Sequence, residues 1–339
     1  MECQSIKKTV FRFKRFSVVN ERSAMKVNTD GVLLGALATV GNDCSRVLDV
    51  GTGTGTIALM VAQRLSDVHV KVSPNHIADD GLILEDDKSE LAENFECESE
   101  LDFCKNINRK LKIDAGESIN RKLKIDVGDS IKCELKIDAV EIDCDSAEEA
   151  AHNFAMSPWA DSLEVHNCSL DDFEQILCCG QNNRCDVDGK LCCANPENIV
   201  EKSLGYDLII SNPPFFEETL HSPDARKART RHSDSLSWRD LVDFAAKWLS
   251  YGDNSRLSMI LPSSQELSVV RYAAENGLFM SRTVHIKSSV KKPVSRSIIE
   301  FSRRRTRDCD VRREELSINA SCGYTEEYLD AMHDFLLFA

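Results

Sequence analysis

The segment Asn212-Pro213-Pro214-Phe215 combines a side-chain amide, two prolines and an aromatic ring. An exocyclic amino nitrogen is a poor nucleophile because its lone pair is delocalised into the adjacent ring or carbonyl, so two acceptors must draw on its hydrogens. The Asn212 side-chain oxygen and the Pro213 carbonyl can do this, while the prolines stiffen the turn and the Phe215 ring can stack on a planar group. The segment therefore predicts catalytic residues that act on an amino group. A proline-rich turn after a strand is the simpler alternative.

A glycine-rich segment, 49–55, follows a strand-like run and precedes a helix-like one. Alternate glycines let the backbone pass close to a bound nucleoside and leave helix amides pointing at it. A dinucleotide fingerprint requires glycine or alanine at the next position, which is Thr56. The spacing resembles instead the donor loop of class I S-adenosylmethionine-dependent methyltransferases, which implies that this segment binds the methionine part of the donor. The cofactor-binding candidates here are Asp49, Gly51, Thr52, Gly53 and Gly55.

A tandem repeat with a period of 12 residues, its copies starting at 107, 119 and 131, precedes the next acidic candidate. In the same resemblance, an acidic residue at the end of the following strand accepts hydrogen bonds from both ribose hydroxyls of the donor. The aligned copies put Glu117, Asp129 and Glu141 at this place. Only the third copy continues without a turn signal into a helix near 146. Glu141 is therefore the predicted ribose-binding residue, and a solvent-facing acid at a strand end is the alternative.

Alternating strand and helix patterns surround these segments. Buried apolar runs predict strands at 46–50, 137–142, 163–165, 206–210 and 257–261, and helical periodicity predicts helices at 56–65, 147–155 and 238–249. The last strands, 283–287 and 297–301, flank a basic loop and predict a terminal hairpin. The expected fold is α/β: a doubly wound, mostly parallel, seven-stranded sheet of the class I methyltransferase (Rossmann-like) type, with an antiparallel hairpin at its C-terminal edge.

Two segments interrupt this alternation. Residues 72–136 are acidic and contain the 12-residue repeats, and residues 178–203 are rich in cysteine, asparagine and glycine. We expect a single methyltransferase domain over 1–339 that carries both as insertions. Zinc sites usually present Cys-x2-Cys pairs, whereas the second insertion has adjacent cysteines, so a surface loop is favoured over a metal site.

The composition is that of a soluble globular chain of 339 residues, with 42 basic and 56 acidic side chains and a net charge of −14. No apolar run approaches the roughly 18 residues that a membrane helix needs, and no signal peptide is evident, so a cytoplasmic protein is expected. The charge is uneven: residues 1–31 hold 7 bases and 3 acids (+4), and residues 285–313 hold 10 bases and 3 acids (+7). Because attraction to phosphates depends on local basic patches, a nucleic-acid partner stays open.

Several further matches narrow the resemblance to one family. The chain resembles the bacterial tRNA(Val) adenine-N6 methyltransferase family, which methylates the adenosine just 3′ of the anticodon, position 37. The matching segments are 11–16, 25–34, 49–55, 157–159, 211–216, 231–236 and 323–328. The resemblance implies a class I methyltransferase fold, bound S-adenosyl-L-methionine and a tRNA substrate. In this resemblance the catalytic segment is Asn212, Pro213, Pro214 and Phe215. The reaction needs no metal and no membrane.

Other residues receive roles by position. Thr29 and Asp30 lie where related enzymes close the donor pocket, although they equally suit a helix cap before 32–37. Asp172 is assigned to the donor adenine, with Asp171 and Ser169 as alternatives. Basic residues that could border the inserted base or follow RNA phosphates are Arg226, Lys227, Arg229, Arg231, His232, Lys291, Lys292 and Arg296.

Alternative functions stay open at this stage. Within the same chemistry, the substrate could be guanine N2 in ribosomal RNA, adenine in DNA or a glutamine amide in a protein. A binding protein that takes up the donor or RNA without turnover is a second class, because the first insertion interrupts the path to the ribose strand. A nicotinamide dehydrogenase is disfavoured by Thr56 and by the Asn212–Phe215 segment.

Overall fold

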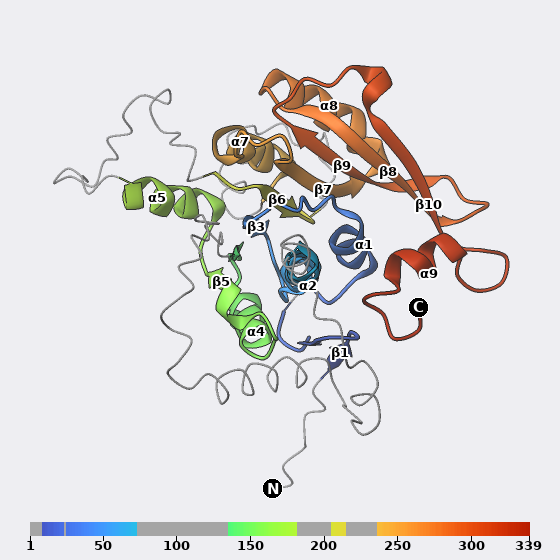
Figure 1. Cartoon of the computed structure of the whole chain (residues 1–339), viewed down its shortest axis with the longest axis horizontal. Coiled ribbons are helices and arrows are strands. Elements are labelled where there is room, and N and C mark those ends of the chain that lie inside the picture. Colours follow the sequence, from blue (N-terminus) through green and yellow to red (C-terminus); the bar gives the residue numbers. More distant parts are fainter. Residues whose placement is uncertain (1–8, 24, 73–134, 182–204, 215–235) are drawn as a thin grey trace, which may run out of the picture. The chain divides into compact units, whose positions relative to one another are not determined.

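The computed structural model describes residues 9–23, 25–72, 135–181, 205–214 and 236–339. Within them, an eight-stranded sheet has the order β10-β8-β9-β7-β6-β3-β4-β5 (Figure 1). Its strands are β3 (Arg46–Val50), β4 (Lys136–Val140), β5 (Leu163–His166), β6 (Leu208–Ser211), β7 (Arg256–Pro262), β8 (Phe279–Ser289), β9 (Val294–Ser302) and β10 (Arg312–Asn319). A separate antiparallel pair joins β1 (Val10–Arg12) to β2 (Ser17–Val19).

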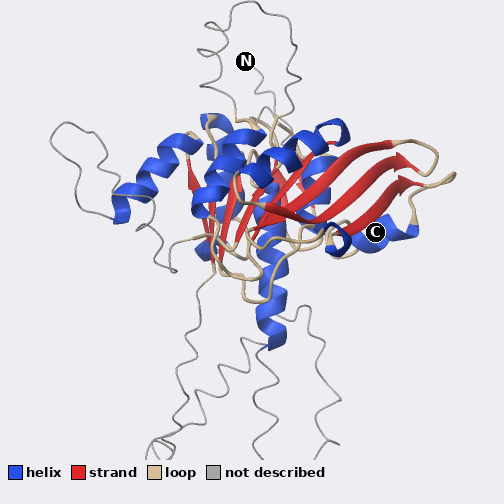
Figure 2. Cartoon of the chain, turned by 90° about the horizontal axis from the view of Figure 1, so that it is seen from above, coloured by secondary structure: helices blue, strands red, loops and turns tan. Residues whose placement is uncertain are grey.

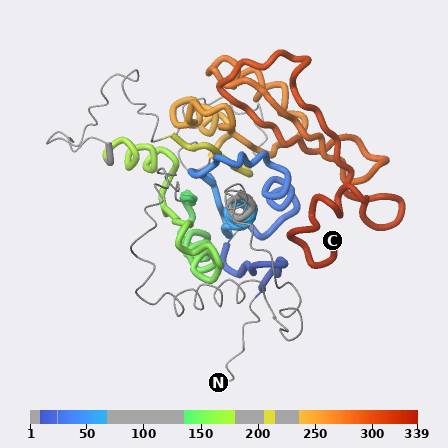
Figure 3. Tube along the Cα trace, viewed as in Figure 1, coloured from blue at the N-terminus to red at the C-terminus, as the bar shows by residue number. Residues whose placement is uncertain are grey.

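The sheet is doubly wound and mostly parallel, as the sequence predicts. β3 pairs in parallel with β4 on one side and with β6 on the other, so Asp49 lies between Ala139 and Ile210. From β3 the chain proceeds outward through β4 to β5, and later from β6 to β7 in the opposite direction (Figure 3). Ligands of such sheets bind beyond the carboxyl ends of the strands at this reversal, which here is where β3, β4 and β6 end.

The C-terminal side of the sheet differs from the prediction in two respects. The expected hairpin is present as β8 and β9, which pair antiparallel, but β9 lies inside the sheet between β7 and β8. The described sheet has eight strands and not seven, because β10 pairs in parallel with β8 and forms the edge. The segment Arg312–Asn319 begins with four charged residues, so its pattern of apolar and polar residues does not predict a strand. It becomes a strand by pairing with β8. Figure 2 shows β8, β9 and β10 as long strands that end in two neighbouring loops.

The helices are α1 (Thr29–Leu37), α2 (Thr56–Val72), α4 (Cys144–Ala155), α5 (Leu170–Gln181), α7 (Trp238–Trp248), α8 (Glu266–Glu275) and α9 (Glu326–Met332), with short 3-10 turns η2 (Ala160–Ser162), η4 (Ser263–Gln265) and η5 (Asp308–Asp310). No helix in these parts of the chain is long and apolar enough to cross a membrane.

Two hydrophobic clusters cover opposite faces of the sheet. Val47 and Leu48, which are neighbours in β3, belong to different clusters because successive side chains of a strand point to opposite faces. The first cluster takes residues from α1, α2, α4 and α9, and the second from α5, α7 and α8. Both faces are buried, which explains the almost continuous apolar character of β3 and β6.

Helix α5 extends into the region expected as a cysteine-rich loop. Cys178 and Cys179 lie in its last turn, because Leu177 and Cys178 pack on the second cluster together with Phe173. The helix runs to Gln181, and the remaining cysteines of that segment lie outside the described residues. The repeats of the first insertion also lie outside them.

Candidate active site

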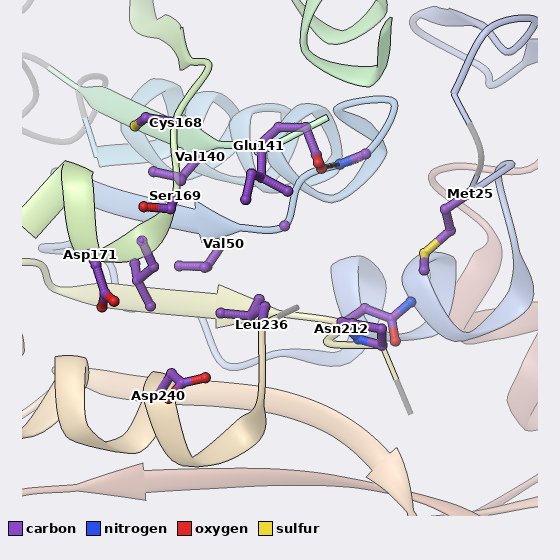
Figure 4. Close-up of a pocket in the computed structure, with 15 residues that line it drawn as sticks. Met25, Val50, Val140, Glu141, Cys168, Ser169, Asp171, Asn212, Leu236 and Asp240 are labelled. Carbon is purple, nitrogen blue, oxygen red and sulfur yellow. Dashed lines mark hydrogen bonds between the residues drawn. The ribbon is translucent and has the colours of Figure 1, made fainter. Parts of the chain in front are cut away.

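A cavity of about 270 Å³ opens at the carboxyl ends of β3, β4 and β6. Asn212 and Met25 lie at one end of it, and Ser169 and Asp171 lie at the other (Figure 4). A second hollow of about 30 Å³ shares Met25, Gly51, Gly53 and Asn212 with the first. The remaining lining of the larger cavity is Val50, Val140, Glu141, Ile142, Cys168, Leu170, Pro214, Leu236 and Asp240. Together the two hollows form an elongated site at the reversal of the sheet.

The glycine-rich turn after β3 supplies backbone to both hollows. Gly51, Gly53 and Gly55 have φ angles of 70°, 56° and 81°, a left-handed region that side chains with a Cβ rarely adopt. Gly51 and Gly53 line the larger cavity, and Thr52 lines the smaller one. Gly55 lines neither: a Cβ there would lie 2.5 Å from the Phe154 ring, so this glycine allows the turn to pack on α4.

Asp49 lies inside β3 beneath this turn and is fully buried. Its Oδ2 accepts hydrogen bonds from the Thr52 hydroxyl at 2.6 Å and from the Ala58 amide at 3.1 Å. Its Oδ1 has no hydrogen-bond partner among the described residues. Burial raises the pKa of Asp49 to about 7, against the effect of these two hydrogen bonds. One oxygen of the Asp49 carboxyl thus stays without a hydrogen bond beneath the turn.

Glu141 follows Val140, the last residue of β4. The observed strand thus ends before the predicted strand, 137–142, does. Its Oε2 accepts a hydrogen bond from the Gly53 amide at 2.8 Å, and its Oε1 accepts one from the Asp143 amide at 2.9 Å. Both its side chain and the glycine-rich turn line the larger cavity (Figure 4). The competing repeat positions, Glu117 and Asp129, lie outside the described residues, so the choice among the three acids stays a prediction.

Asn212 stands directly after β6 and is 8% exposed. Its Nδ2 lies 3.5 Å from Oδ1 of Asn28, and its own Oδ1 is buried without a partner in the described part of the chain. Pro214 also lines the larger cavity, whereas Pro213 is buried. Phe215 lies outside the described residues. The arrangement leaves an unused amide oxygen at the end of the cavity.

The two acidic residues at the start of α5 differ in their placement, and the donor-adenine role assigned to Asp172, with Asp171 as an alternative, stays a prediction. Asp172 does not line the cavity: its Oδ2 accepts from the Ser169 hydroxyl at 2.7 Å, and its amide donates to the Ser169 oxygen at 3.0 Å. This reciprocal pair caps the helix, and it directs the Asp172 carboxylate to Ser169. Asp171 lines the cavity instead.

The N-terminal candidates Thr29 and Asp30 line neither hollow. Thr29 is exposed at the start of α1. The Asp30 carboxylate forms an ion pair of 2.9 Å with Arg296 from β9, so two residues assigned to different roles bind each other. Asn28 and Gly31 line the smaller hollow in their place, and Asn28 caps α1 by accepting from the Gly31 amide at 2.8 Å.

The basic candidates other than Arg296 divide into two groups. Lys291 and Lys292 are exposed in the turn between β8 and β9. Arg226, Lys227, Arg229, Arg231 and His232 lie outside the described residues.

Some lining residues carried no assignment from sequence. Asn28 was detectable in principle, because asparagine before Thr-Asp-Gly is a helix-cap signal. Leu236 directly precedes the N-cap of α7, and Asp240 lies in its first turn, where Ser237 and Asp240 form a capping box. Met25 begins the matching segment 25–34 but received no role there. Cys168 has no local signal, since only the meeting of distant segments brings it to the cavity.

One cluster of potential metal ligands in the described ranges lies elsewhere on the sheet. Asp138, Glu164 and His166 offer ligand atoms within 4.8 Å of one another. The Lys136 ammonium lies 3.5 Å from Asp138 and 3.3 Å from Glu164, and the Tyr206 hydroxyl donates to Asp138 at 2.8 Å. The charges therefore form an ion-pair network, and none of its members lines the cavity.

Comparison with known proteins adds curated relatives over nearly the whole chain. The sequence is 32% identical over 330 residues to the tRNA1(Val) (adenine(37)-N6)-methyltransferase of Trichodesmium erythraeum, covering 96% of this chain and 97% of that protein. It is 28% identical to the protein of the same name from Flavobacterium johnsoniae, covering 97% and 99%, and 30% identical to that of Pseudoalteromonas translucida, covering 86% and 84%. No protein-family model matches.

Among solved structures, the chain is similar to a predicted O-methyltransferase from Agrobacterium tumefaciens, at 14% identity and a TM-score of 0.46, covering 90% of this chain and 96% of that one. It is also similar to a type I restriction-modification methyltransferase subunit from Streptococcus thermophilus, at 11% identity and a TM-score of 0.44, covering 93% and 53%.

Proposed function

The chain belongs to the tRNA1(Val) (adenine(37)-N6)-methyltransferase family, and from that membership we propose that it methylates N6 of an adenosine in tRNA, adenosine 37 of tRNA(Val). The methyl donor is S-adenosyl-L-methionine, which supplies a methyl group already activated by the positive sulfonium. The observation that carries the proposal is the buried, unpartnered Oδ1 of Asn212 at one end of the cavity.

The donor site fits the chemistry of this nucleoside. Glu141 offers carboxylate oxygens to the ribose hydroxyls, and Asp171 lies at the far end, where the adenine amino group needs an acceptor. Gly51 and Gly53 admit close approach of the backbone. Asp49 lines neither hollow, but a negative charge on its buried carboxyl beneath the turn favours the cationic amino-acid part of the donor. This orientation directs the reactive end of the donor toward Asn212.

The catalytic step follows from the groups that face that end. The Asn212 Oδ1 and the Pro213 carbonyl accept hydrogen bonds from the two hydrogens of the target amino group. These hydrogen bonds localise the nitrogen lone pair for attack in line with the methyl group. Phe215 stacks on the adenine ring. No general base is assigned, because the proton can leave to water after methyl transfer.

The tRNA is bound by its backbone while the target base is turned out of its loop into the site. Lys291 and Lys292, together with the basic residues 226–232, supply cations for phosphates. Since its substrate is tRNA, we expect the enzyme to work in the cytoplasm.

Methyl incorporation from labelled S-adenosylmethionine into tRNA of a strain lacking this protein tests the proposal. After digestion to nucleosides, N6-methyladenosine is expected with the wild type and not with Asn212→Ala. Asn254→Ala, a change of an exposed asparagine that binds Asp43, is the matched control. Label in a guanine nucleoside, in DNA or in protein would show that the substrate is not adenosine in tRNA. Donor binding without any labelled product would indicate a protein without turnover.

We propose further that the predicted insertion, 72–136, interrupts one methyltransferase domain, with 73–133 as its separate part. The chain on either side, 1–72 and 134–339, forms one unit, and α2 and β4 are consecutive elements of its fold. Replacing 73–133 by a short glycine-serine linker is expected to retain donor affinity and N6-methylation. A soluble deletion variant that no longer binds the donor would show that the segment is part of the working domain.

A further inference from the structure

The end of the sheet formed by β8, β9 and β10 exposes aromatic rings next to lysines. Tyr324 and Phe338 are stacked with ring centroids 5.2 Å apart and planes 16° apart, and they are 44% and 54% exposed. Tyr328, which is buried, lies on the same ring system at 5.0 Å from Tyr324. Exposure thus rises along the series Tyr328, Tyr324, Phe338. The pair belongs to no part of the donor cavity.

Backbone contacts hold this aromatic pair beside the turn between β8 and β9. Tyr324 forms an isolated bridge with Asn319, the last residue of β10. Asn319 in turn pairs with Ser289 and accepts a hydrogen bond from the Val290 amide at 3.1 Å. The turn that follows exposes Lys291 and Lys292. In Figure 1 the two loops lie next to each other at the same end of the sheet.

The charges at this end suit a polyanion on the side of the turn. Lys287 is paired with Glu315, whereas Lys291 and Lys292 form no ion pair with any described residue. Glu326 and Glu327 are exposed in the first turn of α9 and would repel phosphates on the side of that helix. Phosphate contacts are therefore assigned to the lysines, and only a base to the rings.

This end of the sheet is connected to the active site through β9. Arg296, four residues after Lys292, pairs with Asp30 at the start of α1, next to Asn28 of the smaller hollow. Because a chain rises by at most about 3.3 Å per residue in a strand, and β9 begins at Val294, Arg296 lies within about 13 Å of Lys292. An RNA whose target base enters the cavity thus has its neighbouring nucleotides within reach of this end.

Resting on the proposed function, we propose that Tyr324 and Phe338 form a stacking platform for an unpaired base of the RNA substrate, with Lys291 and Lys292 on the adjoining phosphates. Aromatic side chains bind unpaired bases by stacking, which duplex RNA does not allow. The platform gives a role to the segment Gly323–Tyr328, which the methyl-transfer site leaves unused.

Affinity for an anticodon stem-loop RNA and for a fully paired RNA of the same length tests the platform. Phe338→Ala and Tyr324→Ala are expected to weaken stem-loop binding roughly 10-fold each, the effect of about 1.4 kcal/mol of stacking, and to leave duplex binding unchanged. Phe338→Trp, which keeps an aromatic ring at this position, should bind the stem-loop about as tightly as the wild type. Lys291→Ala and Lys292→Ala should weaken both RNAs and reduce the salt dependence by about one ion each.

Tyr251→Ala is the matched control, because Tyr251 is 60% exposed but lies before β7. Unchanged donor affinity in each variant shows an intact fold. Wild-type stem-loop affinity in both Phe338→Ala and Tyr324→Ala would overturn the platform while leaving tRNA methylation standing. Loss of self-association without loss of RNA affinity would assign the face to a second copy of the chain and would also overturn it. A wild type that methylates no RNA, with Phe338→Ala still binding the stem-loop more weakly, would refute the proposed function alone.

Discussion

The side-chain nitrogen Nδ2 of Asn212 lies 3.5 Å from Oδ1 of Asn28. This contact joins the end of β6 to the cap of α1. Asn28 is itself held by two hydrogen bonds, from the Gly31 amide at 2.8 Å and to the Lys26 carbonyl at 3.1 Å. With its nitrogen directed to Asn28, Asn212 presents the opposite atom, the unpartnered Oδ1, to an incoming amino group. The helix cap thus orients the amide of the proposed catalytic residue.

Variants of Asn28 separate this orientation from helix capping. Serine at position 28 still caps a helix but is too short to reach Asn212, whereas aspartate keeps an acceptor for both partners. We expect Asn28→Ser to lower kcat about 10-fold, a loss of about 1.4 kcal/mol in the transition state, with donor affinity unchanged. Asn28→Asp should stay near the wild type. Equal kcat for Asn28→Ser and the wild type would exclude the orienting contact.

The buried carboxyl of Asp49 predicts a pH dependence of donor binding. Because its folded pKa of about 7 exceeds the ordinary value, the ligand-free folded protein holds a proton that the unfolded chain releases near pH 4. Its contribution to the free energy of unfolding therefore falls as pH rises from about 4 to about 7. A cationic donor favours the ionised carboxylate, so its affinity should rise with pH, by up to about tenfold per unit below that pKa.

Calorimetric titration with S-adenosylmethionine between about pH 6 and pH 8 measures this slope. Asp49→Asn should bind more weakly and lose the part of the slope due to this carboxyl. Ligand-free Asp49→Asn should also unfold at a higher temperature than the wild type near pH 8, since it buries no charge. An identical pH profile in both proteins would show that Asp49 does not titrate with binding.

The two acidic residues at the start of α5 should respond in opposite ways to substitution. Asp171→Ala removes a carboxylate from the cavity and should weaken donor binding about 10-fold, the loss of one hydrogen bond of roughly 1.4 kcal/mol. Asp172→Ala removes the partner of Ser169 and should cost about 1 kcal/mol of stability, with donor affinity kept. Donor titrations and urea unfolding of both variants distinguish the roles. Weaker donor binding in Asp172→Ala alone would restore the original assignment.

Gly55 and Gly277 form a matched pair for the packing of the donor loop. Their φ angles, 81° and 78°, are nearly equal, but a Cβ at Gly277 meets no atom within 4 Å, whereas one at Gly55 lies 2.5 Å from Phe154. Alanine at either site costs about 1–2 kcal/mol for the left-handed backbone. Gly55→Ala should cost about 1–3 kcal/mol more through the clash and should also impair donor binding. Equal unfolding free energies for the two variants would mean that Phe154 moves aside freely.

Much of the fold was predictable because its signals are local. The glycines after β3 require left-handed backbone, and the apolar runs of β3, β6 and β7 match strands buried on both faces. These features place Gly51, Gly53, Glu141 and Asn212 at one edge of the sheet, and all four line the cavity. The count of strands was wrong, because β10 acquires its place only by pairing with β8.

The sequence by itself determined which chemical groups the chain offers and, through strand order, the edge where they meet. The tertiary structure alone decided which of two neighbouring or similar groups faces the cavity. Asp172 binds Ser169, the residue before α5, while Asp171 faces the cavity, and Asp30 binds Arg296 266 residues away. The physical reason is that a carboxylate binds the closest donor that the packed fold brings to it, and sequence spacing does not specify that donor.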